Sequence, residues 1–90
     1  MHKLAVVFHS SFKKKYKKLR IGEQARCDTR LLLFEQNSFH SLLDTHPLHG
    51  EYAGFWSIKI GGDLRAVYEY LGADVVRFVD LGTHSNLYGK

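Results

Sequence analysis

Cysteine, proline and methionine are scarce in this sequence. Its 90 residues include one cysteine, one proline and one methionine. The single cysteine, Cys27, excludes a disulfide within this chain and is typical of proteins from a reducing compartment. Its setting in ARCDTRLLLF predicts a helix face, so we expect a packed thiol rather than a nucleophile.

Long hydrophobic runs are also missing. Near the N-terminus, LAVVF comprises only five apolar residues, far fewer than a signal-peptide core or a membrane span requires. We therefore expect a cytoplasmic protein with no membrane partner.

The composition is that of one folded domain. Hydrophobic residues make up 44% of the chain and charged residues 24%, which argues against disorder. A chain of this length can bury one modest core, so we expect a single domain over residues 1–90. The formal net charge of +4 favours polyanionic partners without identifying one.

The periodicity of apolar residues predicts one strand, two helices and then three strands. Residues 3–8, KLAVVF, form a short apolar run with two β-branched valines that suits a buried strand, whereas Phe12, Tyr16 and Leu19 share one face of a helix. Gly22 interrupts that pattern, and a second helix is expected over residues 23–36.

The stretch 51–88 reads as a meander of three antiparallel strands, because its β-branched and aromatic runs are separated by Gly61-Gly62-Asp63 and Gly72-Ala73-Asp74. The expected fold is therefore α+β, a two-layer sandwich in the order β-α-α-β-β-β with a short C-terminal tail or helix. In this arrangement, the helical hairpin covers one face of a mainly antiparallel sheet and leaves the other face open.

Polar residues that suit phosphate chemistry are expected on the open face. Side chains alternate along a strand, so Lys59 and Arg65 lie opposite the apolar residues of their strands, near Asp63 in the turn. The third strand ends at Gly82-Thr83-His84, which brings a histidine beside them. Loops held by a rigid sheet often carry catalytic groups.

This set of side chains suits the cleavage of RNA without a metal or another cofactor. Such cleavage needs a base for the 2′-hydroxyl, an acid for the leaving 5′-oxygen and cations for the charge on phosphorus. Lys59 and Arg65 supply cations, His84 can transfer protons, and Asp63 can act as a base or orient the imidazole. Tyr88 offers a stacking surface for a nucleobase or, alternatively, packs in the core.

Two further patterns have competing interpretations. The lysines of the first helix are either a solvated face or a phosphate-tracking surface for nucleic acid, and the two are compatible; they are Lys13, Lys14, Lys17 and Lys18. His46 and His49 have a spacing that could serve a metal, but Pro47 keeps them from sharing a helix face and no HExxH motif is present. We expect no metal site.

Four segments in order resemble the RelE/ParE superfamily of bacterial toxins from type II toxin–antitoxin modules, with the closest likeness to its RelE and YafQ branches. They are FKKKYKKL, THPLHG, GFWSIKIGGDLRAVYEYL and VVRFVDLGTHSNLY. The resemblance covers essentially the whole chain and implies the same order of elements as the periodicity does.

The resemblance also implies functional positions. His46, Asp63 and His84 match residues that matter for cleavage in YafQ-like toxins. Lys59, Arg65 and Tyr88 fall where RelE-like toxins keep a catalytic or phosphate-contacting lysine, arginine and tyrosine. The chain mixes the two patterns, so the resemblance leaves open which group is the acid and which the base.

The function implied is a ribosome-dependent endoribonuclease that cleaves mRNA in the ribosomal A site. The basic helix would meet ribosomal RNA, and a cognate antitoxin would mask the toxin. Two alternatives remain on the same scaffold. One is a non-enzymatic inhibitor of DNA gyrase like ParE, and the other is a toxin homologue that binds RNA but has lost catalysis.

Overall fold

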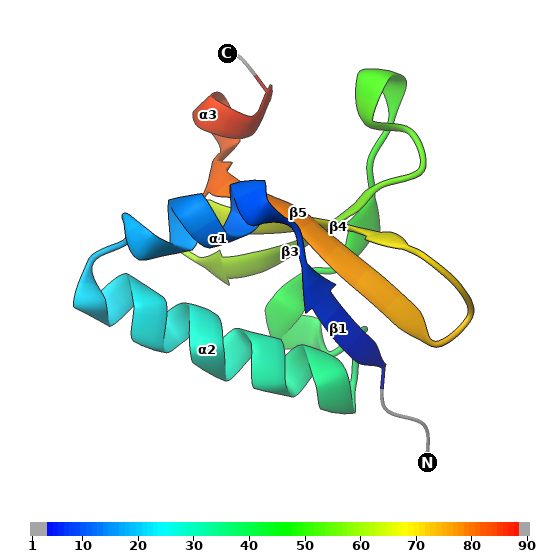
Figure 1. Cartoon of the computed structure of the whole chain (residues 1–90), viewed down its shortest axis with the longest axis horizontal. Coiled ribbons are helices and arrows are strands. Elements are labelled where there is room, and N and C mark those ends of the chain that lie inside the picture. The colour runs from blue at the N-terminus through cyan, green and yellow to red at the C-terminus, as the bar shows by residue number, and fades with distance from the viewer. Residues whose placement is uncertain (1–3, 89–90) are drawn as a thin grey trace.

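The computed structural model describes residues 4–88, except for the side chain of Tyr88. The chain forms five strands and three α-helices, joined in places by short 3₁₀ turns. Figure 1 shows how the labelled helices and strands are arranged. In chain order the elements are β1 (Ala5–Phe8), α1 (Ser10–Lys17), α2 (Ile21–Gln36), η1 (Ser41–Leu43), β2 (His46–Pro47), η2 (Gly50–Tyr52), β3 (Trp56–Gly61), β4 (Leu64–Tyr70), β5 (Val75–Thr83) and α3 (His84–Tyr88). Within the described residues, no helix combines the length and apolar character of a membrane span.

The strands form one sheet in the order β1-β5-β4-β3-β2. The meander of β3, β4 and β5 is antiparallel, and β1 joins its edge by pairing with β5 in parallel. The α+β fold and the order of its main elements are as the sequence predicted. The short strand β2, which pairs His46 with Ser57, was not predicted because two residues show no periodicity.

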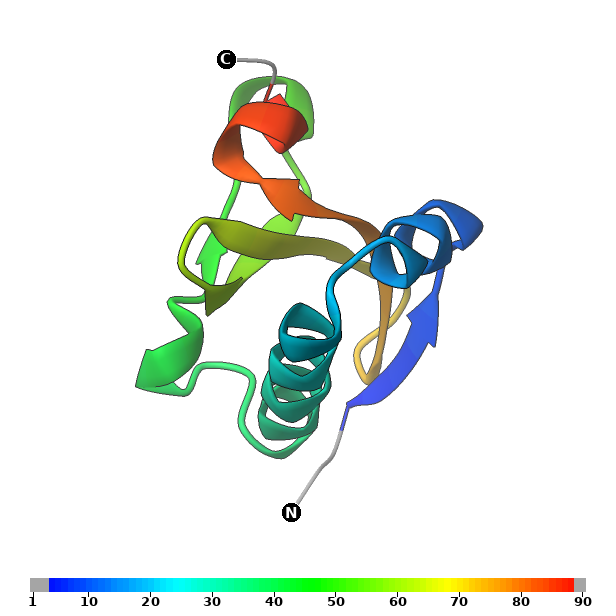
Figure 2. The ribbon, with the colours of Figure 1, turned by 90° about the vertical axis from the view of Figure 1, so that its left-hand side faces the viewer.

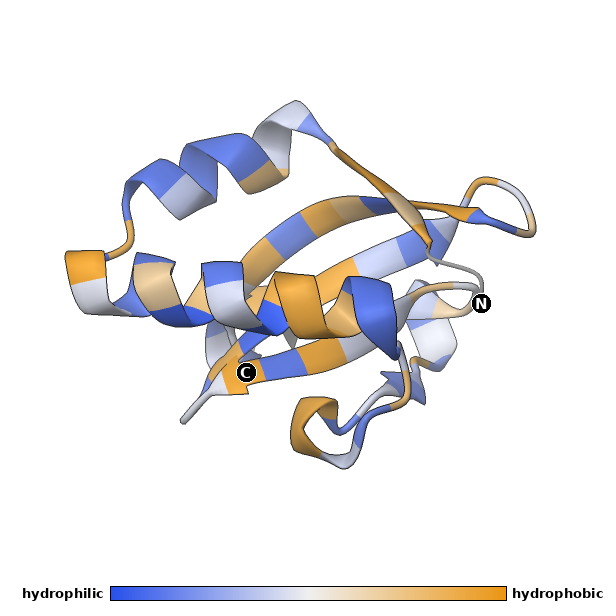
Figure 3. Cartoon of the chain, turned by 90° about the horizontal axis from the view of Figure 1, so that it is seen from below, coloured by the Kyte–Doolittle hydropathy of each residue, from blue (hydrophilic) through white to orange (hydrophobic). Residues whose placement is uncertain are grey.

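The core lies between the sheet and the two long helices. Hydropathy alternates along the strands, as Figure 3 shows, so one face of the sheet is apolar. Phe12 of α1 and Phe34 of α2 pack with Tyr68 and Phe78 of the sheet, and all four side chains are at most 3% exposed. The rings of Phe34 and Tyr68 meet edge to face with centroids 4.8 Å apart.

The second helix begins earlier than the sequence predicted. It starts at Ile21 and includes Gly22, which was expected to break the helical pattern. Gly22 lies in the first turn, so the entropic cost of its flexible backbone is smaller than it would be in the middle of the helix. The Glu23 side chain accepts a hydrogen bond from the Arg20 backbone N–H at 3.1 Å, which stabilises the start of the helix.

The second face of the sheet is less open than expected. Ser57 and Val67 lie on this face, yet they are 0% and 1% exposed. Figure 2 shows why, since α3 and the segment around residues 46–55 lie on the opposite side of the sheet from α2. These two pieces of chain form the walls of a hollow on that face.

Replacing Phe34 by alanine should destabilise the fold strongly. Its ring is fully buried and contacts Tyr68 and Phe78, so the substitution removes a large apolar side chain and leaves a cavity. We expect the free energy of unfolding to fall by about 3–5 kcal/mol, measured by urea denaturation. Leu32→Ala on the same helix is the matched control, because Leu32 is 63% exposed and should change stability little. Equal losses for the two variants would contradict this packing.

Cys27 should be chemically inert in the folded protein. It is fully buried, as the sequence predicted, and this burial, with a smaller contribution from Asp28, raises the pKa of its thiol to about 12. The thiolate is the reactive form, so we expect Ellman's reagent at about pH 8 to modify the native protein at least about 100-fold more slowly than the denatured protein. Because the folded pKa is the higher one, stability should also fall as pH rises above the ordinary thiol value of 9.0. Rapid labelling of the native protein would contradict the burial.

Candidate functional site

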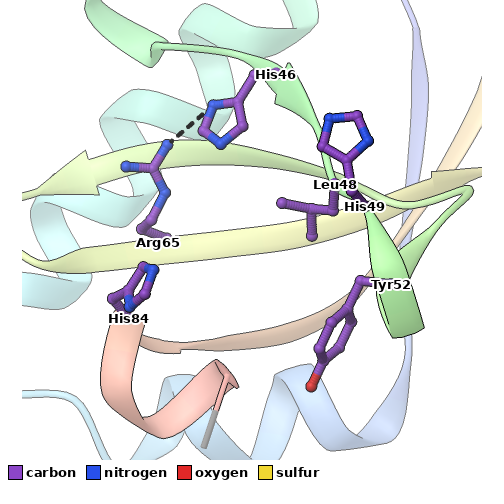
Figure 4. A pocket seen from close by; sticks show the side chains of 6 residues that line it. All are labelled: His46, Leu48, His49, Tyr52, Arg65 and His84. Carbon is purple, nitrogen blue, oxygen red and sulfur yellow. Dashed lines mark hydrogen bonds between the residues drawn. The ribbon is translucent and has the colours of Figure 1, made fainter. Parts of the chain in front are cut away.

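A cavity of about 430 Å³ lies on the face of the sheet opposite α2. Side chains from three separate stretches of the chain line it, and Figure 4 shows them around a common space. The lining residues are His46, Leu48, His49, Tyr52, Arg65 and His84. One guanidinium, three imidazoles and a phenol therefore share a single hollow with one aliphatic side chain.

Arg65 forms the cationic floor of this cavity. It lies on β4 between Lys59 of β3 and Gly82 of β5, and its side chain is only 15% exposed. Its Nε donates a hydrogen bond to Ser57 Oγ at 3.1 Å, while its Nη2 lies 3.3 Å from Asp44 Oδ2. Contacts at both ends of the guanidinium fix its plane, which a lysine ammonium could not reproduce.

His46 lies beside Arg65 because β2 pairs with β3. His46 is opposite Ser57 in that ladder, which brings the imidazole over the guanidinium. Its Nδ1 is 2.9 Å from the Asp44 carbonyl oxygen and 3.5 Å from Arg65 Nη2. The Asp44 contact is the shorter of the two. The carbonyl oxygen of Asp44 can only accept a hydrogen bond, whereas Arg65 Nη2 can only donate one.

His84 reaches the cavity from the end of β5. It opens α3, and the Thr83 hydroxyl accepts a hydrogen bond from the Asn86 backbone N–H at 3.2 Å, as a helix-capping residue does. Leu87 of α3 packs on Gly82, where an added Cβ would approach the leucine side chain to 3.6 Å. This packing sets the direction of α3 and so the position of His84.

Tyr52 provides the aromatic wall. Its hydroxyl donates a 2.6 Å hydrogen bond to the Leu87 carbonyl oxygen, which ties η2 to α3. The ring lines the cavity across from His84, as Figure 4 shows. Tyr52 was not singled out from the sequence, because its distance from α3 along the chain hides the contact.

The structure brings three of the predicted site residues together, namely His46, Arg65 and His84. Lys59 is exposed on the same face and pairs directly with Arg65, but it does not line the cavity. Asp63 lies exposed in the turn after Gly62 and does not line it either. The carboxylate that contacts Arg65 belongs instead to Asp44, which the sequence analysis missed.

Lysines of α1 form a separate feature. The predicted RNA-binding side chains are all exposed, and they are Lys13, Lys14, Lys17 and Lys18. Lys13 and Lys17 border a second, apolar cavity of about 360 Å³ whose other walls include Phe8, Phe12 and Leu31. Tyr88 ends α3, but its side chain is outside the described part of the structure.

The described residues offer no obvious metal centre. Among residues 4–88, no three His, Cys, Asp or Glu side chains are grouped as metal ligands would be. His49 lines the cavity with His46 and His84, yet these three do not form such a group.

Comparisons with solved structures identify the fold. The toxin in the Escherichia coli DinJ–YafQ toxin–antitoxin complex is 21% identical, with a TM-score of 0.77 over 97% of this chain and 99% of that chain. A copper-bound mutant toxin from Helicobacter pylori is 25% identical, with a TM-score of 0.71 over 93% and 98%. A YoeB/ParE toxin from Agrobacterium tumefaciens is 21% identical, with a TM-score of 0.75 over 90% and 99%. These likenesses confirm the predicted RelE/ParE-type fold.

The sequence itself matches a family over nearly its full length. No curated protein sequence gave a match. Residues 4–89, however, match the family described as the bacterial toxin of type II toxin–antitoxin systems, YafQ. The chain therefore belongs to the YafQ family of type II toxins.

Proposed function

We propose that the chain is an endoribonuclease that cleaves mRNA on the ribosome as the toxin of a type II module. The observation that carries this proposal is the convergence of Arg65, His46 and His84 in one cavity. A cation flanked by two imidazoles is what phosphodiester cleavage by general acid–base chemistry needs. Membership of the YafQ toxin family supports the proposal independently.

In the proposed reaction the 2′-hydroxyl of a bound nucleotide attacks the adjacent phosphorus atom. A base accepts the 2′-hydroxyl proton, the bond from phosphorus to the 5′-oxygen breaks, and an acid protonates that oxygen. The products are a 2′,3′-cyclic phosphate and a free 5′-hydroxyl. Arg65 would bind the phosphate, His46 and His84 would carry the protons, and the Tyr52 ring would contact a base.

Other predicted residues have supporting roles in this proposal. Lys59 is the neighbour of Arg65 across β3 and β4, so it adds positive potential at the rim of the cavity. Asp63 lies in the turn at the same end of the sheet and would assist from outside the cavity, as a base or by orienting an imidazole. Tyr88 would stack on a base, as the resemblance to RelE-like toxins implies.

The partners follow from the family and from charge. The exposed lysines of α1 would contact ribosomal RNA through phosphates, which gives affinity without sequence discrimination. A cognate antitoxin would bind and inhibit the protein, a proposal supported by toxin–antitoxin complexes of similar fold, such as DinJ–YafQ. The net charge of +4 favours an acidic antitoxin.

Substituting His84 by alanine should abolish toxicity together with cleavage. Induced wild-type protein should arrest growth and create new 5′ ends in messages, mapped by primer extension. His84→Ala should lower cleavage by about 100-fold or more, because it removes a proton-transfer group.

The matched control for this variant is His9→Asn. His9 caps α1 by accepting a hydrogen bond from the Ser11 backbone N–H, and asparagine can replace it in that role. This variant removes an imidazole outside the cavity and should cleave like the wild type. Growth arrest by the wild type with intact messages and broken DNA would instead support gyrase inhibition and contradict the proposal.

Arg65→Lys should lower RNA cleavage almost as much as removal of a catalytic group does. Lysine keeps the charge but cannot contact Ser57 and Asp44 while also facing a phosphate, so we expect cleavage to fall by about 10²- to 10³-fold. Arg77→Lys is the control, since Arg77 pairs with Glu69 outside the cavity. Circular dichroism should show both variants folded. Equal activity in the two variants would exclude a role for the guanidinium geometry.

A further inference from the structure

We propose that Asp44 is a positioning residue that holds His46 in one tautomer, with its proton on Nδ1 and the lone pair on Nε2. The catalytic meaning of this inference rests on the proposed ribonuclease function, but its geometric content does not. Asp44 contacts both His46 and Arg65, so a single residue arranges two groups of the cavity.

The backbone of Asp44 has an unusual conformation. It has φ 47° and ψ 49°, a left-handed conformation, and is the only described residue other than glycine with positive φ. Most side chains avoid this region, whereas aspartate, asparagine and glycine adopt it more readily. This conformation ends η1 and turns the carbonyl group of Asp44 toward the start of β2.

The hydrogen-bond donors and acceptors around Asp44 match in only one tautomer of His46. The Asp44 carbonyl oxygen has two lone pairs and lies 2.9 Å from His46 Nδ1 and 3.3 Å from Arg65 Nη2. The second Nη2 proton can reach Asp44 Oδ2, also at 3.3 Å. If Nδ1 carries a hydrogen, both lone pairs of the Asp44 carbonyl oxygen accept hydrogen bonds and both protons of Arg65 Nη2 are donated. If Nδ1 carries none, one of these lone pairs has no donor among the described residues.

The alternative tautomer fits poorly. With the proton on Nε2, the lone pair of Nδ1 would face the carbonyl oxygen at 2.9 Å, which places two acceptors against each other. Among the residues that the structure describes, the only donor left for Nδ1 would be Arg65 Nη2 at 3.5 Å, the limit of a hydrogen bond. Nδ1 therefore has two neighbours, the Asp44 carbonyl oxygen and Arg65 Nη2, and the carbonyl oxygen determines the tautomer.

The consequence is a defined direction of proton transfer. A neutral ring with hydrogen on Nδ1 can only accept a proton at Nε2. Figure 4 shows that this second nitrogen lies on the side of the ring that faces the cavity. In the proposed reaction, His46 would therefore take the 2′-hydroxyl proton through Nε2, while its Nδ1 keeps the hydrogen bond to the Asp44 carbonyl oxygen.

Long-range ¹H–¹⁵N correlation spectra of the ¹⁵N-labelled full chain test this inference. They distinguish protonated from bare ring nitrogens, and a His46→Gln sample identifies the His46 signals. At about pH 8.5, where imidazoles are mostly neutral, we expect hydrogen on Nδ1 and a bare Nε2. A ring protonated on Nε2 would overturn the proposal, whatever the activity of the protein.

Two substitutions separate the carbonyl from the carboxylate. Asp44→Gly keeps the left-handed backbone and should keep the tautomer, although Arg65 loses its carboxylate partner. Asp44→Ile removes the same carboxylate and disfavours the left-handed backbone, because isoleucine is β-branched. We expect the fraction of Nδ1-protonated His46 to fall in this variant. An unchanged fraction, with the remote amide spectrum intact, would contradict the role of Asp44.

Cleavage assays on the same proteins distinguish this inference from the proposed function. Asp44→Ile should cleave about 10- to 100-fold more slowly than Asp44→Gly, the loss expected when a partner that orients a histidine is removed. Asp74→Asn, in the turn between β4 and β5, is the control for a lost carboxylate and should match the wild type. If the wild type has the expected tautomer but no nuclease activity, the proposed function fails and the positioning role stands. If the wild type cleaves and Asp44→Ile cleaves as fast as Asp44→Gly, the positioning role fails.

Discussion

Strict alternation of side chains along β4 is the constraint on which both the core and the cavity depend. Leu64, Ala66 and Tyr68 are buried under the helices, and Arg65 between them points to the opposite face. A slip of one residue would exchange the two faces, which would expose the core and bury the guanidinium. The free energy of core burial therefore also fixes the register of Arg65, and β4 is secured further by pairing on both of its edges.

The fold was predictable because its signals are local. Period-two patterns marked β3, β4 and β5, helical spacing marked α1 and α2, and glycine-rich turns separated the strands. The approach of His84 to Arg65 was predictable for the same reason, since a short hairpin and a strand end determine it. β1 also gains backbone partners by joining the sheet, but its parallel pairing with β5 joins the two ends of the fold, and no local pattern specifies that partner.

The finer design of the cavity was not predictable, because it depends on contacts between distant segments. Asp44 reaches Arg65 only through a left-handed turn and a strand of two residues, and neither leaves a periodic pattern in the sequence. Tyr52 meets α3 through one side-chain hydrogen bond. Asp63 was predicted to belong to the site because the alternation of side chains puts it on the same face as Arg65. It lies instead in the turn that precedes β4, outside the paired part of the sheet. Its contribution to cleavage, like that of Lys59, remains a prediction.

The parallel pairing of β1 with β5 has a consequence for how the chain reaches its native state. Ala5 is opposite Val75, so β1 has no hydrogen-bonded neighbouring strand until β5 is available. The aromatic core also depends on β5, because Phe12 and Phe34 both pack on Phe78 of that strand. Native contacts between such distant segments slow folding. Because His84 directly follows β5, the cavity cannot be complete until that strand has taken its place between β1 and β4.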